Sequence, residues 1–181
     1  MDLERKFCSS TSDLTVTDGS LIEGYASLFG ELDQGGDVVA RGAYAASLQA
    51  LAARKSRVKM LWQHDPSQPI GVWDEVREDA TGLYVRGRII EEVDRGREAK
   101  ALVQAGAIDG LSIGYRTRRA SRDEKGRRVL TELELWEVSL VTFPMLAEAR
   151  LASAKADVLD PRPMECIAAI FRDAARDLAG G

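Results

Sequence analysis

The sequence predicts an α+β fold: a partly closed, mostly antiparallel β-barrel of six or seven strands, with two inserted helices and a C-terminal helix. Short apolar or alternating segments recur between polar, glycine-bearing turns, a pattern typical of antiparallel strands. Segments with apolar residues three and four positions apart interrupt this pattern and indicate helices. Barrel closure is favoured because so many consecutive strands would otherwise leave long edges unpaired.

Six segments have the apolar content and the boundaries of strands. In chain order they are 21–29, 58–64, 70–76, 83–90, 111–117 and 129–142. The second should stop at Pro66, because proline removes a ladder donor and restrains the residue before it. This places His64 at a strand end. The polar segment 77–82 suits a hairpin turn, and the charged run 118–128 suits a solvated hairpin tip.

Three segments carry helical spacing. The first covers 41–53. The second should be capped by Asp94, run to about residue 104 and stop at Gly106. The third lies near the C-terminus. We therefore expect 1–150 to be one domain, and 151–181 to be a linker and helical tail that the fold does not need.

The composition is that of one globular domain. Of 181 residues, 45% are hydrophobic and 30% are charged, which is enough apolar material for a core. The formal net charge of −4 argues against broad electrostatic binding to nucleic acid or to an anionic membrane. No apolar run approaches the ~18 residues of a spanning helix, and the first residues lack the apolar core of a secretion signal. We expect an intracellular protein.

A basic run from Arg116 to Arg128 is the feature that would support a nucleic-acid-binding protein instead. Asp123 and Glu124 interrupt this run, and Tyr115 is its only neighbouring aromatic residue. Binding to nucleic acid normally combines basic residues with interleaved aromatic ones. A solvated hairpin tip is therefore the favoured interpretation.

Cysteine and histidine counts limit the possible chemistry. Cys8 and Cys166 lie near opposite ends of the chain, outside any metal-binding spacing, and are expected to be buried free thiols. His64 is the only histidine, so any metal site that needs two histidines from one chain is excluded. We expect no metal, nucleotide or organic cofactor, because the sequence also lacks a glycine-rich phosphate loop.

Three residues could together perform nucleophilic catalysis. An imidazole such as that of His64 can take a proton from a hydroxyl and return it to a leaving amine. Ser112 lies between Gly110 and Gly114, which would leave room for a substrate backbone. Glu137 lies among apolar neighbours, where a carboxylate needs a partner such as an imidazolium.

Each of these residues also has an ordinary structural interpretation. His64 could bond to the backbone at a strand end, Ser112 could be a strand serine, and Glu137 could lie at a solvated edge. The segment 110–114 formally matches the Gly-x-Ser-x-Gly motif of α/β-hydrolases. That motif requires a strand, a sharp turn and a helix, whereas a strand and a hairpin are expected here, so the α/β-hydrolase interpretation is rejected.

Ordered sequence islands resemble the prohead serine protease family of tailed phages, whose fold is similar to that of herpesvirus assemblin. The resemblance covers roughly residues 4 to 150 and extends to the version encoded by phage-derived gene-transfer particles. The islands are Gly24-Tyr25-Ala26 through Asp37 with Arg41-Gly42-Ala43-Tyr44, then Trp62-Gln63-His64-Asp65, Gly110-Leu111-Ser112-Ile113-Gly114-Tyr115, and Leu133-Glu134-Leu135-Trp136-Glu137-Val138-Ser139-Leu140-Val141-Thr142-Phe143-Pro144.

The resemblance implies a serine endopeptidase with His64 as general base, Ser112 as nucleophile and Glu137 as the acid that orients the imidazole. Assemblins use a second histidine in the third role, and this chain has none, so a carboxylate is the expected substitute, with Asp65 next in line after Glu137. The oxyanion donors are expected among the backbone amides of 143–146 or 116–120.

The same resemblance implies partners and a location. The enzyme would act in the host cytoplasm, inside the immature procapsid. There it would cleave the scaffolding segment of the major capsid protein and then itself, with the linker that begins near Leu151 as the site of self-cleavage. A non-catalytic scaffold module that binds capsid protein is the alternative. Self-association is compatible with both, and no nucleic-acid or membrane partner is expected.

Overall fold

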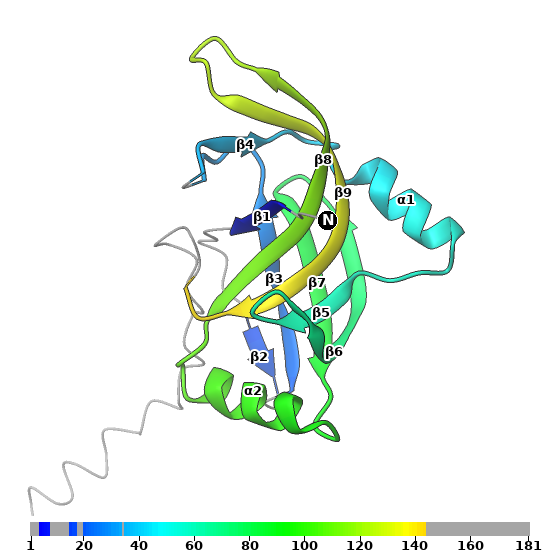
Figure 1. The fold of residues 1–181 in the computed structure, drawn as a ribbon, viewed down its shortest axis with the longest axis vertical. Coiled ribbons are helices and arrows are strands. Elements are labelled where there is room, and N and C mark those ends of the chain that lie inside the picture. The colour runs from blue at the N-terminus through cyan, green and yellow to red at the C-terminus, as the bar shows by residue number, and fades with distance from the viewer. Residues whose placement is uncertain (1–3, 8–14, 18–19, 34, 144–181) are drawn as a thin grey trace, which may run out of the picture.

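The computed structural model describes residues 4–7, 15–17, 20–33 and 35–143 (Figure 1). Nine strands and two helices lie within these ranges. In chain order they are β1 (Glu4–Phe7), β2 (Thr15–Thr17), β3 (Leu21–Leu28), β4 (Asp37–Val39), α1 (Ala45–Ala53), β5 (Lys59–Trp62), β6 (Asp65–Glu78), β7 (Gly82–Ile89), α2 (Asp94–Gln104), β8 (Gly110–Arg122) and β9 (Arg128–Val141).

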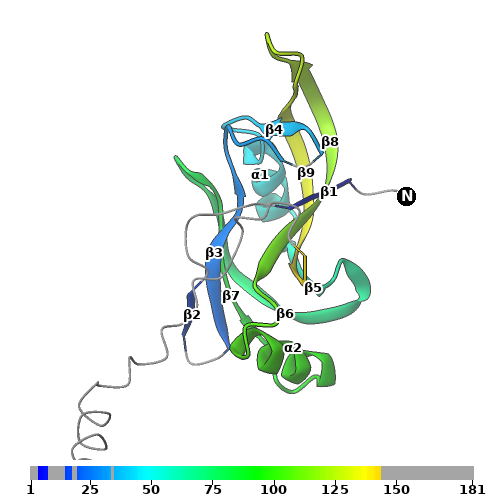
Figure 2. The ribbon, with the colours of Figure 1, turned by 90° about the vertical axis from the view of Figure 1, so that its left-hand side faces the viewer.

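All nine strands belong to one curled sheet. Its order is β1-β8-β9-β5-β6-β7-β3-β2, with β4 added beside β9. The long β8–β9 pair and the β3–β7 pair lie on opposite sides of the molecule, and α2 lies at one end (Figure 2). β3 also contacts β8, so the two ends of the strand order curl toward each other. The partly closed barrel expected from the sequence is thus broadly confirmed.

The sheet is mixed, which corrects the expectation of a mostly antiparallel barrel with six or seven strands. β4 and β5 both run parallel to β9, while the other neighbours in the sheet pair antiparallel. β1, β2 and β4 were not expected at all. Each has only three or four residues, too few to show a strand period, and parallel pairing between distant segments leaves no local signature.

Helix α1 fills a gap along one edge of β9. β4 pairs with residues 128–130 of that edge and β5 with 137–140. Between them, the Leu133 N–H donates to the Ala43 carbonyl (2.8 Å) and the Leu135 N–H donates to Ser47 Oγ (2.9 Å). These acceptors satisfy donors of β9 that no strand of the described residues pairs, and they fix α1 beside the sheet (Figure 1).

The core occupies the inside of the curl. Its large, fully buried side chains come from strands far apart in the sequence and include Ile22, Met60, Ile70, Leu83, Ile113, Leu130 and Leu140. Trp73 of β6 belongs to this core, and its indole Nε1–H donates to the Val138 carbonyl of β9 (3.2 Å). A Cβ at Gly87 would lie 2.7 Å from the Trp73 ring, so this glycine permits the close packing of β7.

Several expected boundaries changed. Asp94 does not cap α2: Val93 occupies the cap position without a side-chain cap, and the Asp94 carboxylate pairs with Arg97 within the first turn. β8 and β9 extend into the run expected to be a solvated tip, which leaves 123–127 as the turn. The expected C-terminal helix and tail lie outside the described residues. Within those residues, no helix is long and apolar enough to cross a membrane.

Candidate active site

The three residues predicted from the sequence meet on neighbouring elements. Ser112 lies on β8, Glu137 lies on β9, and His64 lies in the turn between β5 and β6. The Ser112 Oγ lies 2.6 Å from His64 Nε2, and His64 Nδ1 lies 2.5 Å from Glu137 Oε1. A hydroxyl, an imidazole and a carboxylate therefore form a continuous chain of hydrogen bonds.

The β8–β9 pairing places the serine and the glutamate. Ser112 lies opposite Ser139, and Gly114 lies opposite Glu137. Because side chains alternate along a strand, Glu137 and Ser139 share one face of the sheet. A Cβ at Gly114 would lie 2.8 Å from Glu137 Cδ and 2.9 Å from Cγ. The space at Gly114 is thus occupied by the Glu137 carboxylate, which corrects the expectation that this glycine makes room for substrate.

A tight turn delivers the imidazole. Gln63 and His64 have φ angles of 52° and 62°, and the flanking residues Trp62 and Asp65 pair across the hairpin. Two positive φ angles are the pattern of a two-residue hairpin turn, which most side chains disfavour. Gln63 fixes this conformation, since its N–H donates to the Leu140 carbonyl (3.0 Å) and its Nε2 donates to Thr142 Oγ1 (2.6 Å). The turn is thereby attached to the end of β9.

The turn also corrects the expected strand stop at Asp65-Pro66. β6 begins at Asp65 and contains Pro66. On β5, consecutive residues Trp62 and Leu61 pair with Asp65 and Pro69, so residues 66–68 bulge out of the ladder. Proline is tolerated in such a bulge because its missing N–H is not needed for strand pairing.

Ser139 is a fourth member of the network that the sequence reasoning missed. Its Oγ donates to Glu137 Oε2 (2.5 Å) and accepts a hydrogen bond from the His64 backbone N–H (3.2 Å). One hydroxyl thus holds both the carboxylate and the turn that carries the imidazole. The sequence feature that could have indicated this role is its spacing, since Ser139 follows Glu137 by two residues on the same strand face.

The hydrogen bonds assign the protons. An ionised carboxylate only accepts, so Glu137 requires the hydrogen on His64 Nδ1 and leaves Nε2 free to accept from the Ser112 hydroxyl. Ser112 is fully buried, and Glu137 and His64 are 4% and 9% exposed. Low exposure strengthens such electrostatic contacts. The arrangement can remove the proton from Ser112 and stabilise the imidazolium that results.

Asp65, the alternative third member, is engaged elsewhere. Its Oδ1 accepts from the Ser67 backbone N–H (2.8 Å) and from Ser67 Oγ (2.6 Å). These hydrogen bonds, the side-chain one foremost, lower the pKa of the Asp65 carboxyl. Asp65 therefore acts as a cap for its own bulge, and Glu137 is the carboxylate in contact with His64.

The strand geometry excludes one of the two stretches, 116–120, that were expected to supply the oxyanion donors. Residues 116–120 lie within β8, and Arg116 is four residues from Ser112. At a rise of ~3.3 Å per residue, its amide lies about 13 Å along the strand, too far to contact an oxyanion formed at Ser112. Phe143 lies just past the end of β9, and 144–146 lie outside the described residues.

The outer edge of β8 is also paired. β1 runs antiparallel to β8, with Phe7 opposite Ser112. A peptide therefore cannot add as a further strand to this stretch of β8 while β1 is in place. Elsewhere in the described ranges, no group of three or more His, Cys, Asp and Glu side chains is arranged to hold a metal. Cys8 and Cys166 fall outside those ranges.

Comparisons with known proteins identify the family. The family model of the caudovirus prohead serine protease matches residues 8–161. The prohead protease of Enterobacteria phage HK97 is 34% identical over 141 residues, and that of Escherichia phage T5 is 30% identical over 135 residues. These matches cover 75% and 74% of this chain. The chain belongs to the caudovirus prohead serine protease family.

Two further matches bear on length and fold. A capsid polyprotein of Pseudomonas phage PAJU2 is 31% identical over 109 residues, which cover 56% of this chain and 16% of that protein. The capsid assembly protease of bacteriophage T4 superimposes with a TM-score of 0.61 at 16% identity, covering 77% of this chain and 97% of that structure, which shows a shared fold. The matches span 60% and 62% of the two prohead proteases.

Proposed function

We propose that this chain is a serine endopeptidase of procapsid maturation, with Ser112 as nucleophile, His64 as general base and Glu137 as the orienting acid. Membership of the prohead serine protease family supports the class of reaction. The observation that carries the residue assignment is the continuous contact from Ser112 through His64 to Glu137. Three groups in this order can activate a serine hydroxyl.

The chemistry proceeds in two halves. Ser112 Oγ attacks the carbonyl carbon of the scissile peptide bond while its proton passes to His64 Nε2. The tetrahedral oxyanion collapses, the C–N bond breaks, and His64 returns the proton to the leaving amine. Water then attacks the Ser112 ester with His64 again as base, which releases a carboxylic acid and regenerates the serine. Glu137 offsets the imidazolium charge in both halves.

The proposed substrate is the scaffolding segment of the major capsid protein, followed by the protease itself. The family name and the match to a capsid polyprotein support a capsid substrate. We place the reaction inside the immature procapsid in the host cytoplasm. In this account, cleavage releases the scaffolding fragments and allows the shell to mature.

Incubation with the cognate major capsid protein tests the proposal. Ser112→Ala and His64→Ala should each abolish processing, because members of such a catalytic unit act non-additively. Ser121→Ala, an exposed serine on the same strand, is the matched control and should process at the wild-type rate. Fragments that appear at the wild-type rate with Ser112→Ala would refute the mechanism. Binding of capsid protein without cleavage by the wild type would support the scaffold module instead.

A further inference from the structure

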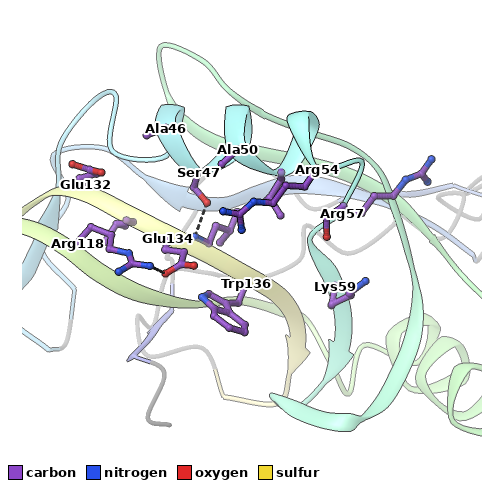
Figure 3. Close-up of a pocket in the computed structure, with 14 residues that line it drawn as sticks. Ala46, Ser47, Ala50, Arg54, Arg57, Lys59, Arg118, Glu132, Glu134 and Trp136 are labelled. Atoms are coloured by element: carbon purple, nitrogen blue, oxygen red, sulfur yellow. Dashed lines mark hydrogen bonds and ion pairs between the residues drawn. The ribbon is translucent and has the colours of Figure 1, made fainter.

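A cavity lies between α1 and β9. Its volume is about 430 Å³, within the range of ligand-binding pockets. It opens between the β9 residues paired with β4 and those paired with β5, where no strand within the described ranges pairs with that edge. Figure 3 shows side chains from α1 on one side of this cavity and side chains from β8 and β9 on the other.

The lining combines an apolar floor with a cationic rim. The apolar part consists of aliphatic side chains of α1 and β9 together with the indole of Trp136, which is 39% exposed. Four basic residues from three different segments belong to the lining, namely Arg54, Arg57, Lys59 and Arg118. Figure 3 shows the Arg54 side chain pointing between α1 and β9, whereas the Arg57 side chain points away from Trp136 and Glu134.

Most of this positive charge is not neutralised. Arg118 pairs with Glu134, and Glu132, the other acidic lining residue, pairs with Arg119. Among the described residues, the side chains of Arg54, Arg57 and Lys59 make no ion pair. Three cations without an ion pair among the described residues therefore belong to the lining, in a chain whose formal net charge is −4.

We infer that this cavity binds an acidic peptide segment, with an apolar side chain on the floor and carboxylates at the Arg54 and Lys59 rim. The apolar side chain of such a peptide matches the floor, and its carboxylates match the cationic rim. A nucleic-acid strand fits less well, because Trp136 is the only aromatic side chain that the described residues contribute to the cavity, and successive bases need several stacking platforms. The inference concerns binding alone and holds whether or not Ser112 is the nucleophile.

The cavity shares strand β9 with the candidate active site. Trp136 directly precedes Glu137 on β9, and Lys59 lies opposite Glu137 in the β5–β9 ladder. The cavity and the Ser112–His64–Glu137 network thus share strand β9, although none of these three residues lines the cavity. An acidic segment of a partner protein bound there would be tethered to the molecule that carries the proposed cleavage site, which raises the effective concentration of neighbouring peptide.

Calorimetric titration of the Ser112→Ala protein tests this inference without cleavage of the ligand. The probe is the blocked hexapeptide Glu-Glu-Leu-Leu-Glu-Glu, compared with Gln-Gln-Leu-Leu-Gln-Gln. We expect the acidic peptide to bind, and we expect the double substitution Arg54→Gln with Lys59→Gln to weaken it about tenfold or more. Arg86→Gln with Lys125→Gln removes two cations outside the cavity and should change affinity less than about twofold.

A second variant separates loss of charge from loss of fold. Ala50→Trp fills the cavity from an exposed position on α1 and should block the acidic peptide while leaving the circular dichroism spectrum unchanged. No binding at millimolar peptide, equal affinity for the glutamine peptide, or an equal loss in the control pair would overturn the inference. Tighter binding of oligothymidylate at the same residues would also overturn it, by assigning the cavity to nucleic acid.

Discussion

At the residue scale, Ser139 joins the two halves of the candidate active site. It donates to the Glu137 carboxylate and accepts from the backbone N–H of His64. We predict that Ser139→Ala lowers kcat about 10- to 100-fold with little change in KM, because a positioning hydroxyl acts on the chemical step. Steady-state kinetics on a capsid-derived peptide measure this, and Ser139→Thr should restore part of the rate. A change in KM alone would contradict the positioning role.

A second prediction at this scale concerns the substitution of Gly114. Its missing side chain leaves the space that the Glu137 carboxylate occupies, and that carboxylate is held on both oxygens. Gly114→Ala should displace Glu137 and lower kcat/KM about as far as Glu137→Gln does, by about 100-fold or more. Gly35→Ala is the matched control, since a Cβ there meets only the Asp33 side chain. An active Gly114→Ala enzyme would place the third role on another residue.

The candidate active-site residues could be predicted from the sequence, but the contacts between them and Ser139 could not. A single histidine forces any imidazole chemistry onto His64, and ordered islands point to Ser112 and Glu137. The role of Ser139 depends on how the 63–64 turn meets β9, and no local pattern specifies that contact. A strand serine is common, so its type alone carries no signal.

At the element scale, the two hairpin turns show when a local sequence pattern is enough to predict a turn. The polar residues 77–82 predicted the β6–β7 turn correctly, because turn residues bond their own backbone. The 63–64 turn was missed because Pro66 indicated a strand end. Whether a proline ends a strand or occupies a bulge depends on the register of its partner, which the local sequence does not contain.

Asp79 gives the element-scale prediction. Partial burial raises its pKa, but hydrogen bonds from the Thr81 backbone, Tyr25, the Gly82 backbone and Arg77 outweigh this and lower the pKa to about 2. The folded pKa is below the ordinary value of 3.8, so its stabilisation is present above about pH 4 and is lost as the pH falls toward 2. Loss of this carboxylate should loosen the β6–β7 turn.

Urea unfolding of Asp79→Asn checks this. We expect the variant to be about 1–3 kcal/mol less stable at pH 6 and the difference to shrink as the pH is lowered toward 2. Asp74→Asn, which removes an exposed ion pair with Arg88 in the same hairpin, should cost less than about 1 kcal/mol. A stability difference for Asp79→Asn that is independent of pH would be inconsistent with the account.

At the scale of the whole molecule, the barrel closes through contacts that local patterns do not record. β5 reaches β9 across more than seventy residues, and it does so in parallel. Strand propensity predicted most of the long strands, but their partners are chosen by the burial of the whole core. This is why the α+β class could be predicted from the sequence while the mixed pairing could not.

The prediction at the scale of the whole molecule concerns the C-terminal segment. We propose that 1–150 form the protease domain and that 151–181 are a linker and helical tail removed by self-cleavage. The alanine-rich residues after Leu151, followed by Pro161 and Pro163, fit a cleavable linker. A chain that ends at Arg150 should stay soluble and unfold cooperatively with nearly the wild-type midpoint. Insolubility or loss of cooperative unfolding would show that the tail belongs to the core.

The central claim is that Ser112 is a nucleophile activated by His64, and covalent labelling tests it most directly. Diisopropyl fluorophosphate should form one adduct per chain, and peptide mass spectrometry should locate it on Ser112. Labelling should vanish in Ser112→Ala, fall sharply in His64→Ala and persist in Ser121→Ala, because only a serine with an adjacent base reacts readily. An unlabelled Ser112 in a protein that still cleaves capsid protein, or an adduct on another serine, would contradict the account.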